Sequence, residues 1–188
     1  MKKPEGYDSV NLNAERVSIG PHTAVIKGVE EKTSKGGKPM IVVYIDFGKG
    51  DEQEGMFKRI FDSDEREEKF WPFQATQYIL TENPYGGTNR SFKAFITSVE
   101  NSNGFNVDWD AADFGKQFKG KKVGVMYGTV EEEYNGQRNL RQRIRWFFDI
   151  HKKDDQVTPD TKWLPTQPQQ SSVDSAFMDV GTEALPFA

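Results

Sequence analysis

Alternation of apolar and polar residues along the first third of the chain predicts β-strands joined by short turns. The clearest run is residues 39–47, in which every second residue from Ile41 to Phe47 is apolar. Residues 22–32 form a similar run before it, and residues 54–61 form a third run after a glycine-rich turn. We therefore expect a three-stranded antiparallel meander.

The period changes between residues 62 and 120, where helix signals replace the alternation. We expect a short charged helix that stops near Trp71, a second helix from Pro72 through Leu80, and a third over residues 91–101. The third has apolar residues at helical spacing and a glycine soon after its end, which favours an amphipathic helix.

Two further strands are expected at residues 121–134 and 138–150, joined by Asn135-Gly136, a dipeptide typical of two-residue hairpin turns. Three strands, then helices, then two strands is the order of a five-stranded Greek-key barrel of the oligonucleotide-binding (OB) type. The expected fold class is therefore mainly β with inserted helices. It is an OB-type barrel with a long helical insertion between strands 3 and 4.

The last expected strand carries four arginines, Arg138, Arg141, Arg143 and Arg145, and no carboxylate. Alternation places the last three on one face and the apolar residues, Trp146 among them, on the other. Arginine pairs with phosphate and stacks on flat rings, so this stripe indicates a nucleic-acid track. The alternative is a solvated outer face of the sheet.

Composition limits the classes of protein to consider. A length of 188 residues suits one domain of about 150 residues and a tail. The absence of cysteine excludes disulfides, thiolate metal sites and cysteine nucleophiles, and two histidines are too few for a histidine-rich metal cluster. The apolar runs are short, so we expect a cytoplasmic protein with no membrane segment, no bound metal and no cofactor.

The net charge of −4 is unevenly distributed. Residues 1–151 hold 22 of the 25 cationic and 23 of the 29 acidic residues, so the excess acid lies beyond them. Residues after 151 are rich in Pro, Gln and Ser, which is typical of a flexible linker. We expect an arm at 1–16, an OB-fold nucleic-acid-binding domain at 17–151, and a linker with an acidic tail at 152–188.

Aromatic rings on the expected strands near cations are candidates for stacking on bases, although packing is an equal alternative for each. Lysines in the first turn could clamp a strand beside an OB face. The candidate nucleic-acid-binding residues are Lys35, Lys38, Tyr44, Phe57, Arg59, Phe61, Tyr127, Tyr134, Arg138, Arg141, Arg143 and Arg145.

No catalytic constellation is evident, and we expect a protein that is not an enzyme. Asp108, Asp110 and Asp113 are candidate metal-binding carboxylates of a nuclease, but their spacing fits helix capping better. Neither His22 nor His151 has a serine or cysteine partner in a recognisable sequence context.

The end of the chain, Met178-Asp179-Val180-Gly181-Thr182-Glu183-Ala184-Leu185-Pro186-Phe187, resembles the acidic tip ending in Pro-Phe of bacterial single-stranded DNA-binding proteins. Gly120-Lys121-Lys122-Val123 and Tyr134-Asn135-Gly136 are also similar to this family, particularly to its phage-encoded members. The sequence has fewer acids than the usual tip, and Ala188 follows the phenylalanine.

This resemblance implies that the tail recruits replication and recombination proteins. Its apolar anchor would be Leu185, Pro186 and Phe187, while Asp179 and Glu183 would steer the encounter. The function we expect is to coat and protect single-stranded DNA during phage DNA replication, recombination or repair in the bacterial host cell or nucleoid. The alternatives are a phage structural or protein–protein interaction module and a metal-dependent nuclease.

Overall fold

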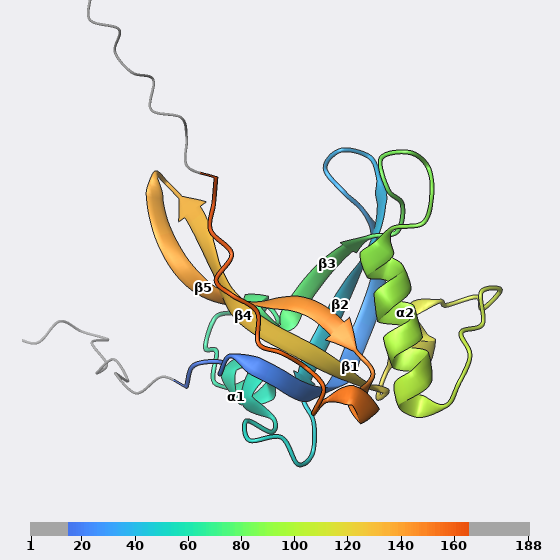
Figure 1. The fold of residues 1–188 in the computed structure, drawn as a ribbon, viewed down its shortest axis with the longest axis horizontal. Coiled ribbons are helices and arrows are strands. Elements are labelled where there is room, and N and C mark those ends of the chain that lie inside the picture. The colour runs from blue at the N-terminus through green and yellow to red at the C-terminus, as the bar shows by residue number, and fades with distance from the viewer. Residues whose placement is uncertain (1–14, 166–188) are drawn as a thin grey trace, which may run out of the picture.

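The computed structural model describes residues 15–165, and Figure 1 shows their arrangement as a ribbon. Within this range the framework is one antiparallel five-stranded sheet with two α-helices and three short 3₁₀ helices. The acidic tip of the tail and nearly all of the expected N-terminal arm lie outside the described residues.

The five strands are β1 (Gly20–Thr33), β2 (Pro39–Phe47), β3 (Thr76–Leu80), β4 (Lys122–Tyr134) and β5 (Gln137–Phe148). They lie in the order β3-β2-β1-β4-β5, and each neighbouring pair is antiparallel. The long strand β1 is central, while β3 and β5 form the two edges. The expectation of a mainly β chain with five strands is therefore confirmed, in the form of an open sheet.

The prediction of a strand at residues 54–61 is wrong, because the chain there forms helix α1 (Met56–Asp62). Met56 and Phe57 are both fully buried whereas residues 58–60 are exposed, so burial does not alternate as it would in a strand with one solvent-facing side. Gly55 begins the helix with a φ of 68°, and Asp46 of β2 accepts a 3.0 Å hydrogen bond from the backbone N–H of Phe57.

The helix predicted from Pro72 through Leu80 is also wrong. The segment makes one turn of 3₁₀ helix, η1 (Phe73–Ala75), and continues directly as strand β3. All five residues of β3 pair with β2, so that Thr76 lies opposite Tyr44. Pairing with a strand far away in the sequence decides the conformation of this short segment, and a local pattern cannot reveal it.

The amphipathic helix is confirmed as α2 (Arg90–Asn103), which packs its buried face against the sheet (Figure 1). Asn89 caps its first turn by accepting the Ser91 backbone N–H, and Gly104 ends it in the left-handed region at φ 60°. A 3₁₀ helix, η2 (Gly115–Phe118), follows before β4. Because α1 lies between β2 and β3, the insertion between β3 and β4 is shorter than expected.

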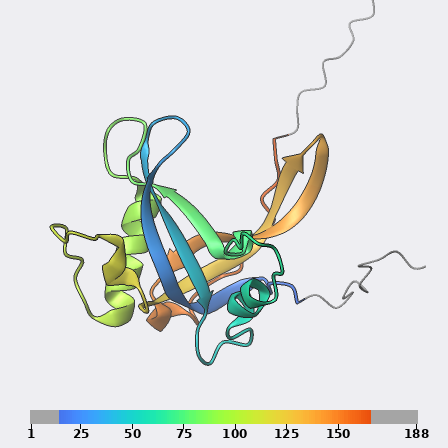
Figure 2. The same cartoon turned by 180° about the vertical axis from the view of Figure 1, so that it is seen from behind.

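The hairpin of β4 and β5 is confirmed, with Asn135 and Gly136 at φ 52° and 74° in its turn. Its tip projects from the body of the protein, as Figure 2 shows from behind. Near the base the register shifts, so that Met126 pairs with Trp146 and the next residue, Tyr127, pairs with Ile144. Arg145 is the extra residue of this β-bulge.

The bulge reverses the alternation beyond it. Ile144 and Phe147 both join the core, whereas Trp146, which alternation assigns to the apolar side, is 36% exposed. Phe148 is buried on the opposite side from Phe147, and its ring occupies the space over Gly124, where a Cβ would come within 2.4 Å of it.

The chain after β5 forms a third short 3₁₀ helix, η3 (Ile150–Lys152), and then returns along β4. Lys162 donates its backbone N–H to the Thr129 carbonyl oxygen at 3.0 Å and accepts the Glu131 N–H at 2.8 Å. Residues 152–165, which the sequence assigns to a linker, therefore include a segment that is bonded to the sheet.

Candidate nucleic-acid interface

A groove lies between the β4–β5 hairpin and the turn that precedes β3. Its volume is ≈ 730 Å³. We call it the hairpin groove. Its lining residues are Phe73, Gln74, Glu132, Tyr134, Gln137, Asn139, Arg141 and Arg143. The odd-numbered residues of β5 from Gln137 to Arg143 thus share this face, in agreement with strand alternation.

Arg143 is the best-fixed cation of the groove. Its guanidinium carbon lies 4.4 Å from the centre of the Phe73 ring, and its Nε and Nη2 atoms each donate a 2.6 Å hydrogen bond to the Glu132 carboxylate. The bidentate pair and the ring hold the guanidinium plane in one orientation. Glu132 also offsets part of the charge that Arg143 offers to a phosphate.

Arg141 is the more available cation. It is exposed, it lines the same groove, and it forms no ion pair with any residue in the range 15–165. A phosphate at Arg141 would therefore displace no carboxylate.

The other two arginines of the predicted stripe do not line the hairpin groove. Arg138 points to the opposite face of β5 and lies 3.6 Å from Glu131 and 3.4 Å from Glu133. Arg145, at the bulge, donates hydrogen bonds to the carbonyl oxygens of Thr129 and Asp160. The prediction that Arg141, Arg143 and Arg145 form one cationic face is therefore wrong, because the bulge separates Arg145 from the other two.

Exposed aromatic rings accompany the groove cations. Phe73 is 58% exposed and Tyr78 on β3 is 53% exposed, with ring centres 6.4 Å apart. Tyr134, at the hairpin tip, is 76% exposed. Flat exposed rings beside cations form the kind of surface on which unpaired bases stack. Tyr134 was predicted from the sequence, whereas Phe73 and Tyr78 were missed because their segment was assigned to a helix.

A second hollow, of ≈ 480 Å³, adjoins the same segment on its other side. We call it the tyrosine hollow; its lining includes Lys27, Tyr44, Phe61, Lys69, Phe70 and Trp71. Residues 70–74 therefore contribute side chains to both hollows, Phe70 to one and Phe73 to the other. Tyr44 and Phe61, both predicted from the sequence, are brought together here.

Tyr44 is partly buried, and its hydroxyl donates a 3.1 Å hydrogen bond to Glu30. Burial is the main reason why the pKa of Tyr44 is raised, and the bond to Glu30 adds to it. Phe61 packs against Trp71 with ring centres 5.4 Å apart, and the Trp71 indole N–H donates to the Ile45 carbonyl oxygen at 2.8 Å. The rings of this hollow are thus held by specific contacts.

Two predicted stacking residues are core residues. Phe57 and Tyr127 are both 0% exposed, and the Tyr127 hydroxyl donates a 2.8 Å hydrogen bond to the Gln74 carbonyl oxygen. Burial raises the pKa of Tyr127 well above its usual value. The prediction of base stacking by these two rings is therefore wrong, because they pack against Phe47 in the core instead.

The remaining predicted cations lie away from both hollows. Arg59, on α1, pairs with Glu15 at 3.0 Å. Lys35 and Lys38 lie on the exposed turn between β1 and β2, at the end of the sheet away from α1 (Figure 1). These two lysines would contact a bound nucleic-acid strand only if that strand extends from the hairpin groove to the β1–β2 turn.

The aspartates considered as metal ligands serve the local backbone. Asp108 accepts the Asp110 N–H at 3.0 Å, and Asp113 accepts the Lys116 N–H at 3.1 Å. Among residues 15–165, no three histidine, aspartate or glutamate side chains gather as a metal-binding group.

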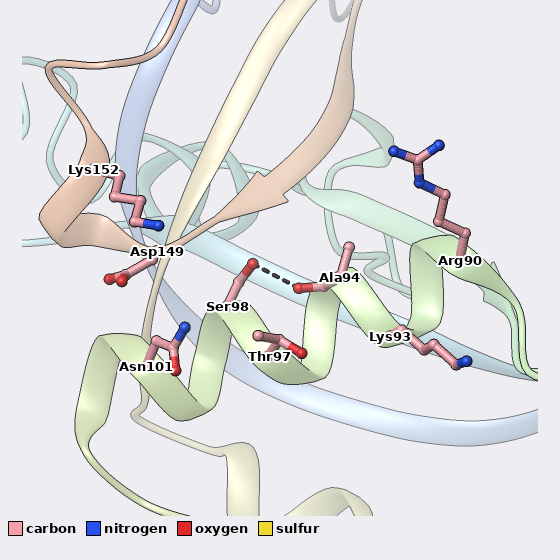
Figure 3. Close-up of a pocket in the computed structure, with 8 residues that line it drawn as sticks. All are labelled: Arg90, Lys93, Ala94, Thr97, Ser98, Asn101, Asp149 and Lys152. Carbon is pink, nitrogen blue, oxygen red and sulfur yellow. Dashed lines mark hydrogen bonds between the residues drawn. The ribbon is translucent and has the colours of Figure 1, made fainter.

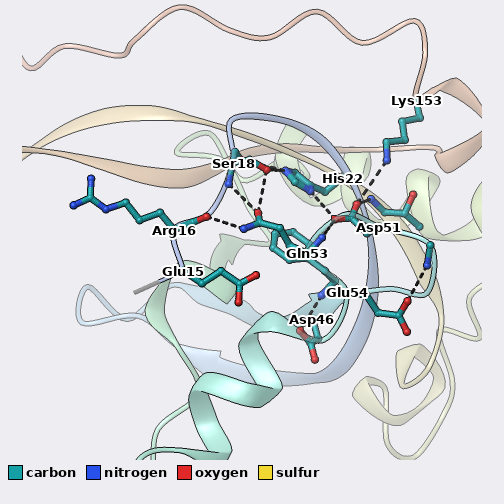
Figure 4. Close-up of polar contacts among 12 residues, drawn as sticks. Glu15, Arg16, Ser18, His22, Asp46, Asp51, Gln53, Glu54 and Lys153 are labelled. Atoms are coloured by element: carbon teal, nitrogen blue, oxygen red, sulfur yellow. Dashed lines mark hydrogen bonds and ion pairs between the residues drawn. The ribbon is translucent and has the colours of Figure 1, made fainter. Parts of the chain in front are cut away.

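His22 does have a serine and a carboxylate partner, contrary to the sequence-based interpretation. Its Nδ1 lies 2.9 Å from Asp51 and its Nε2 lies 3.2 Å from the Ser18 hydroxyl oxygen. Figure 4 draws these contacts. The Gln53 amide is oriented by donating to the Arg16 carbonyl oxygen, and its own oxygen accepts both the hydroxyl and the backbone N–H of Ser18.

The Ser18 hydroxyl proton is thus directed at Gln53 and away from His22, which also lies 3.1 Å from the Ser18 carbonyl oxygen. An activated nucleophile would need the opposite direction of donation. The network instead fastens the chain before β1 to the loop after β2. Burial tends to raise the pKa of Asp51, but hydrogen bonds from His22 and from the N–H groups of Gln53 and Thr23 outweigh it and keep that pKa below its usual value.

No protein-family model matches this chain, and no curated protein sequence is significantly similar to it. Over residues 15–165, no helix has both the length and the apolar composition needed to cross a bilayer.

Proposed function

We propose that this protein binds single-stranded DNA with an OB-type Greek-key barrel, and that the hairpin groove is the main contact surface. It would coat and protect the strand without catalysing a reaction on it. The strand would lie with phosphates at Arg141 and Arg143 and with bases against Phe73, Tyr78 and Tyr134.

The topology supports the OB-type interpretation. In the strand order β3-β2-β1-β4-β5, the first strand lies between β2 and β4, and α2 lies between β3 and β4 along the chain. This is the connectivity expected of a five-stranded Greek-key barrel with a helix before its fourth strand. The faces and hairpins of such barrels are common surfaces for oligonucleotides.

The observation that carries the proposal is the stacked pair of Arg143 and Phe73 inside a groove that also holds Arg141. A cation for phosphate and a flat ring for a base stand next to each other, each with part of its surface exposed. Binding through backbone charge and stacking alone is tolerant of sequence, which suits a protein that coats transient single strands.

The acidic tail would recruit replication and recombination proteins, and the site of action would be the cytoplasm of a bacterial host cell. Asp179, Glu183, Leu185, Pro186 and Phe187 lie outside the described residues, so this part of the proposal rests on the sequence. Residues 171–188 contain no lysine or arginine, and Asp174 adds to their negative charge.

A second candidate function, a phage structural or protein–protein interaction module, is favoured by Glu131, Glu132 and Glu133. These residues pair with Arg138 and Arg143, and a groove with both signs of charge suits a protein surface as well as a polyanion.

Titration with labelled dT, duplex DNA and RNA of equal length distinguishes the two functions. Single-stranded DNA binding predicts a higher affinity for dT than for duplex, with an affinity that falls linearly with the logarithm of salt concentration. Failure to bind any of the three at low salt would favour the interaction module.

A further inference from the structure

Two adjoining hollows lie beside α2, outside both surfaces described above. The first, of ≈ 410 Å³, lies between α2 and η3, and Figure 3 shows its lining with Lys93 and Arg90 at one end and Lys152 at the other. The second, also ≈ 410 Å³, lies between β3, α2 and β5. Arg90 and Ala94 line both, so the two lie side by side, and we call them together the α2 trough.

The trough is cationic in a chain whose net charge is negative. Its charged lining consists of Arg90, Lys93, Arg145 and Lys152 against the single carboxylate of Asp149. Among the residues of 15–165 none of these four cations forms an ion pair, in contrast to Arg138 and Arg143 of the hairpin.

The only lining carboxylate is already engaged. Asp149 accepts the backbone N–H of His151 at 3.0 Å and so caps η3. Arg145 is oriented by the carbonyl oxygens of Thr129 and Asp160, which fix its guanidinium without cancelling its charge. A polyanion in the trough would therefore displace few internal ion pairs.

An aromatic ring in the trough favours a nucleic acid over an acidic peptide. Trp146 is 36% exposed at the wall formed by β5, and its indole N–H donates a 3.1 Å hydrogen bond to Gln156. The bond holds the indole in place while part of its surface remains exposed. A fixed ring among unpaired cations offers both a stacking surface and phosphate contacts.

The trough and the hairpin groove are lined by neighbouring parts of the same two segments. Arg143 lines the groove and the next two residues, Ile144 and Arg145, line the trough. In the same way Gln74 lines the groove and Gln77 lines the trough. The contact between Arg143 and Phe73 brings these two segments together, so the groove and the trough are neighbours on the surface.

We propose that a single strand longer than the hairpin groove continues past the β3 and β5 edges into the α2 trough, where Arg90, Lys93 and Lys152 contact its phosphates and Trp146 a base. This inference rests on the proposed function and adds a second segment to the binding track. Short oligonucleotides would occupy the hairpin groove alone.

The test compares two dT lengths, about 8 and about 24 nucleotides, because one OB domain covers roughly 4 to 16 nucleotides. Full-length wild type is measured beside the triple variant Arg90→Ala, Lys93→Ala, Lys152→Ala. The control variant Lys49→Ala, Lys116→Ala, Lys119→Ala removes the same charge from exposed lysines that line neither surface.

The readout is the slope of log affinity against log salt, because a longer strand gains affinity from extra registers even without new contacts. Wild type and control should show a slope more negative by about 2 for the long strand, or about 0.7 for each of three phosphates. The trough variant should lose this increment and keep the slope and affinity for the short strand.

An equal length increment in the trough variant and in the control would overturn the inference and leave the proposed function standing. Failure of wild type to bind the short strand would overturn the proposed function and the inference together.

Discussion

The guanidinium of Arg143 stacks over Phe73, with 4.4 Å between the guanidinium carbon and the ring centre, and joins β5 to the turn before β3. Glu132 holds the same guanidinium from the neighbouring strand β4. The contact therefore ties three segments together at the floor of the hairpin groove. The exposed parts of Phe73 and Arg143 are the surfaces proposed to contact a base and a phosphate.

Replacing Phe73 by alanine should weaken dT binding by about 1 to 3 kcal/mol, because a base would lose its stacking surface. The free energy of unfolding should change little, since the ring is 58% exposed. Fluorescence titration and urea unfolding measure the two effects. Tyr85→Ala is the matched control, because Tyr85 is 96% exposed and lines neither the hairpin groove nor the tyrosine hollow; an equal loss in both variants would refute a specific role for Phe73.

Arg141 and Arg138 provide a comparison of two arginines on opposite faces of one strand. Arg141→Ala should make the log-log salt slope of dT binding less negative by about 0.7, since one phosphate contact is lost. Arg138→Ala should leave the slope unchanged, because Arg138 faces Glu131 and Glu133 outside the groove. The same slope change in both variants would contradict a specific phosphate contact at Arg141.

The buried hydroxyl of Tyr127 should matter for stability and not for binding. Tyr127→Phe removes the hydrogen bond to the Gln74 carbonyl oxygen and should lower the free energy of unfolding by about 0.5 to 1.5 kcal/mol. The affinity of the folded protein for dT should be retained. Urea unfolding and titration of the same sample provide both values, and a binding loss without a stability loss would contradict the core assignment.

Asp51 should contribute stability above the acidic range. Its folded-state pKa is lowered, so its contribution is present above the unfolded pKa of about 3.9 and is lost as the pH falls through the folded value. Asp51→Asn should therefore be destabilising at pH 7, and the difference from wild type should shrink below about pH 4. Thermal unfolding from pH 7 down to pH 3 measures this difference; a gap that is constant with pH would contradict the role of the carboxylate charge.

Deletion of residues 171–188 should preserve or strengthen dT binding at low salt, because a tethered acidic segment competes weakly for cations. Recruitment of replication and recombination proteins should be lost in this variant and in Phe187→Ala. A pull-down with full-length protein and both variants measures recruitment. Identical partner lists from all three would contradict the recruiting tail.

The sequence predicted the elements whose signals are local. The hairpin turn at Asn135-Gly136 and the helix ended by Gly104 both follow from residue preferences within a few positions. The edge strand β3 was missed because its conformation comes from pairing with β2, a strand roughly 30 residues earlier in the chain. Thr76 of β3, for example, pairs with Tyr44 of β2.

The candidate site was also predicted only where its signals are local. Arg141, Arg143 and Tyr134 follow from strand alternation, and they do line the hairpin groove. The bulge at Arg145 could not be read from the pattern, because it depends on the register with β4. Phe73 could not be predicted, because its contact with Arg143 depends on how the turn before β3 packs against the hairpin.

Photo-crosslinking identifies the residues that lie against the DNA strand. A dT oligonucleotide of about 8 nucleotides, within the length that one OB domain covers, carries a photoreactive base and is irradiated with the full-length protein before peptides are mapped by mass spectrometry. We expect crosslinks to Phe73, Tyr78 or Tyr134, and we expect them to be lost when unlabelled dT competes. Competed crosslinks confined to residues outside the hairpin groove and β3 would contradict this expectation.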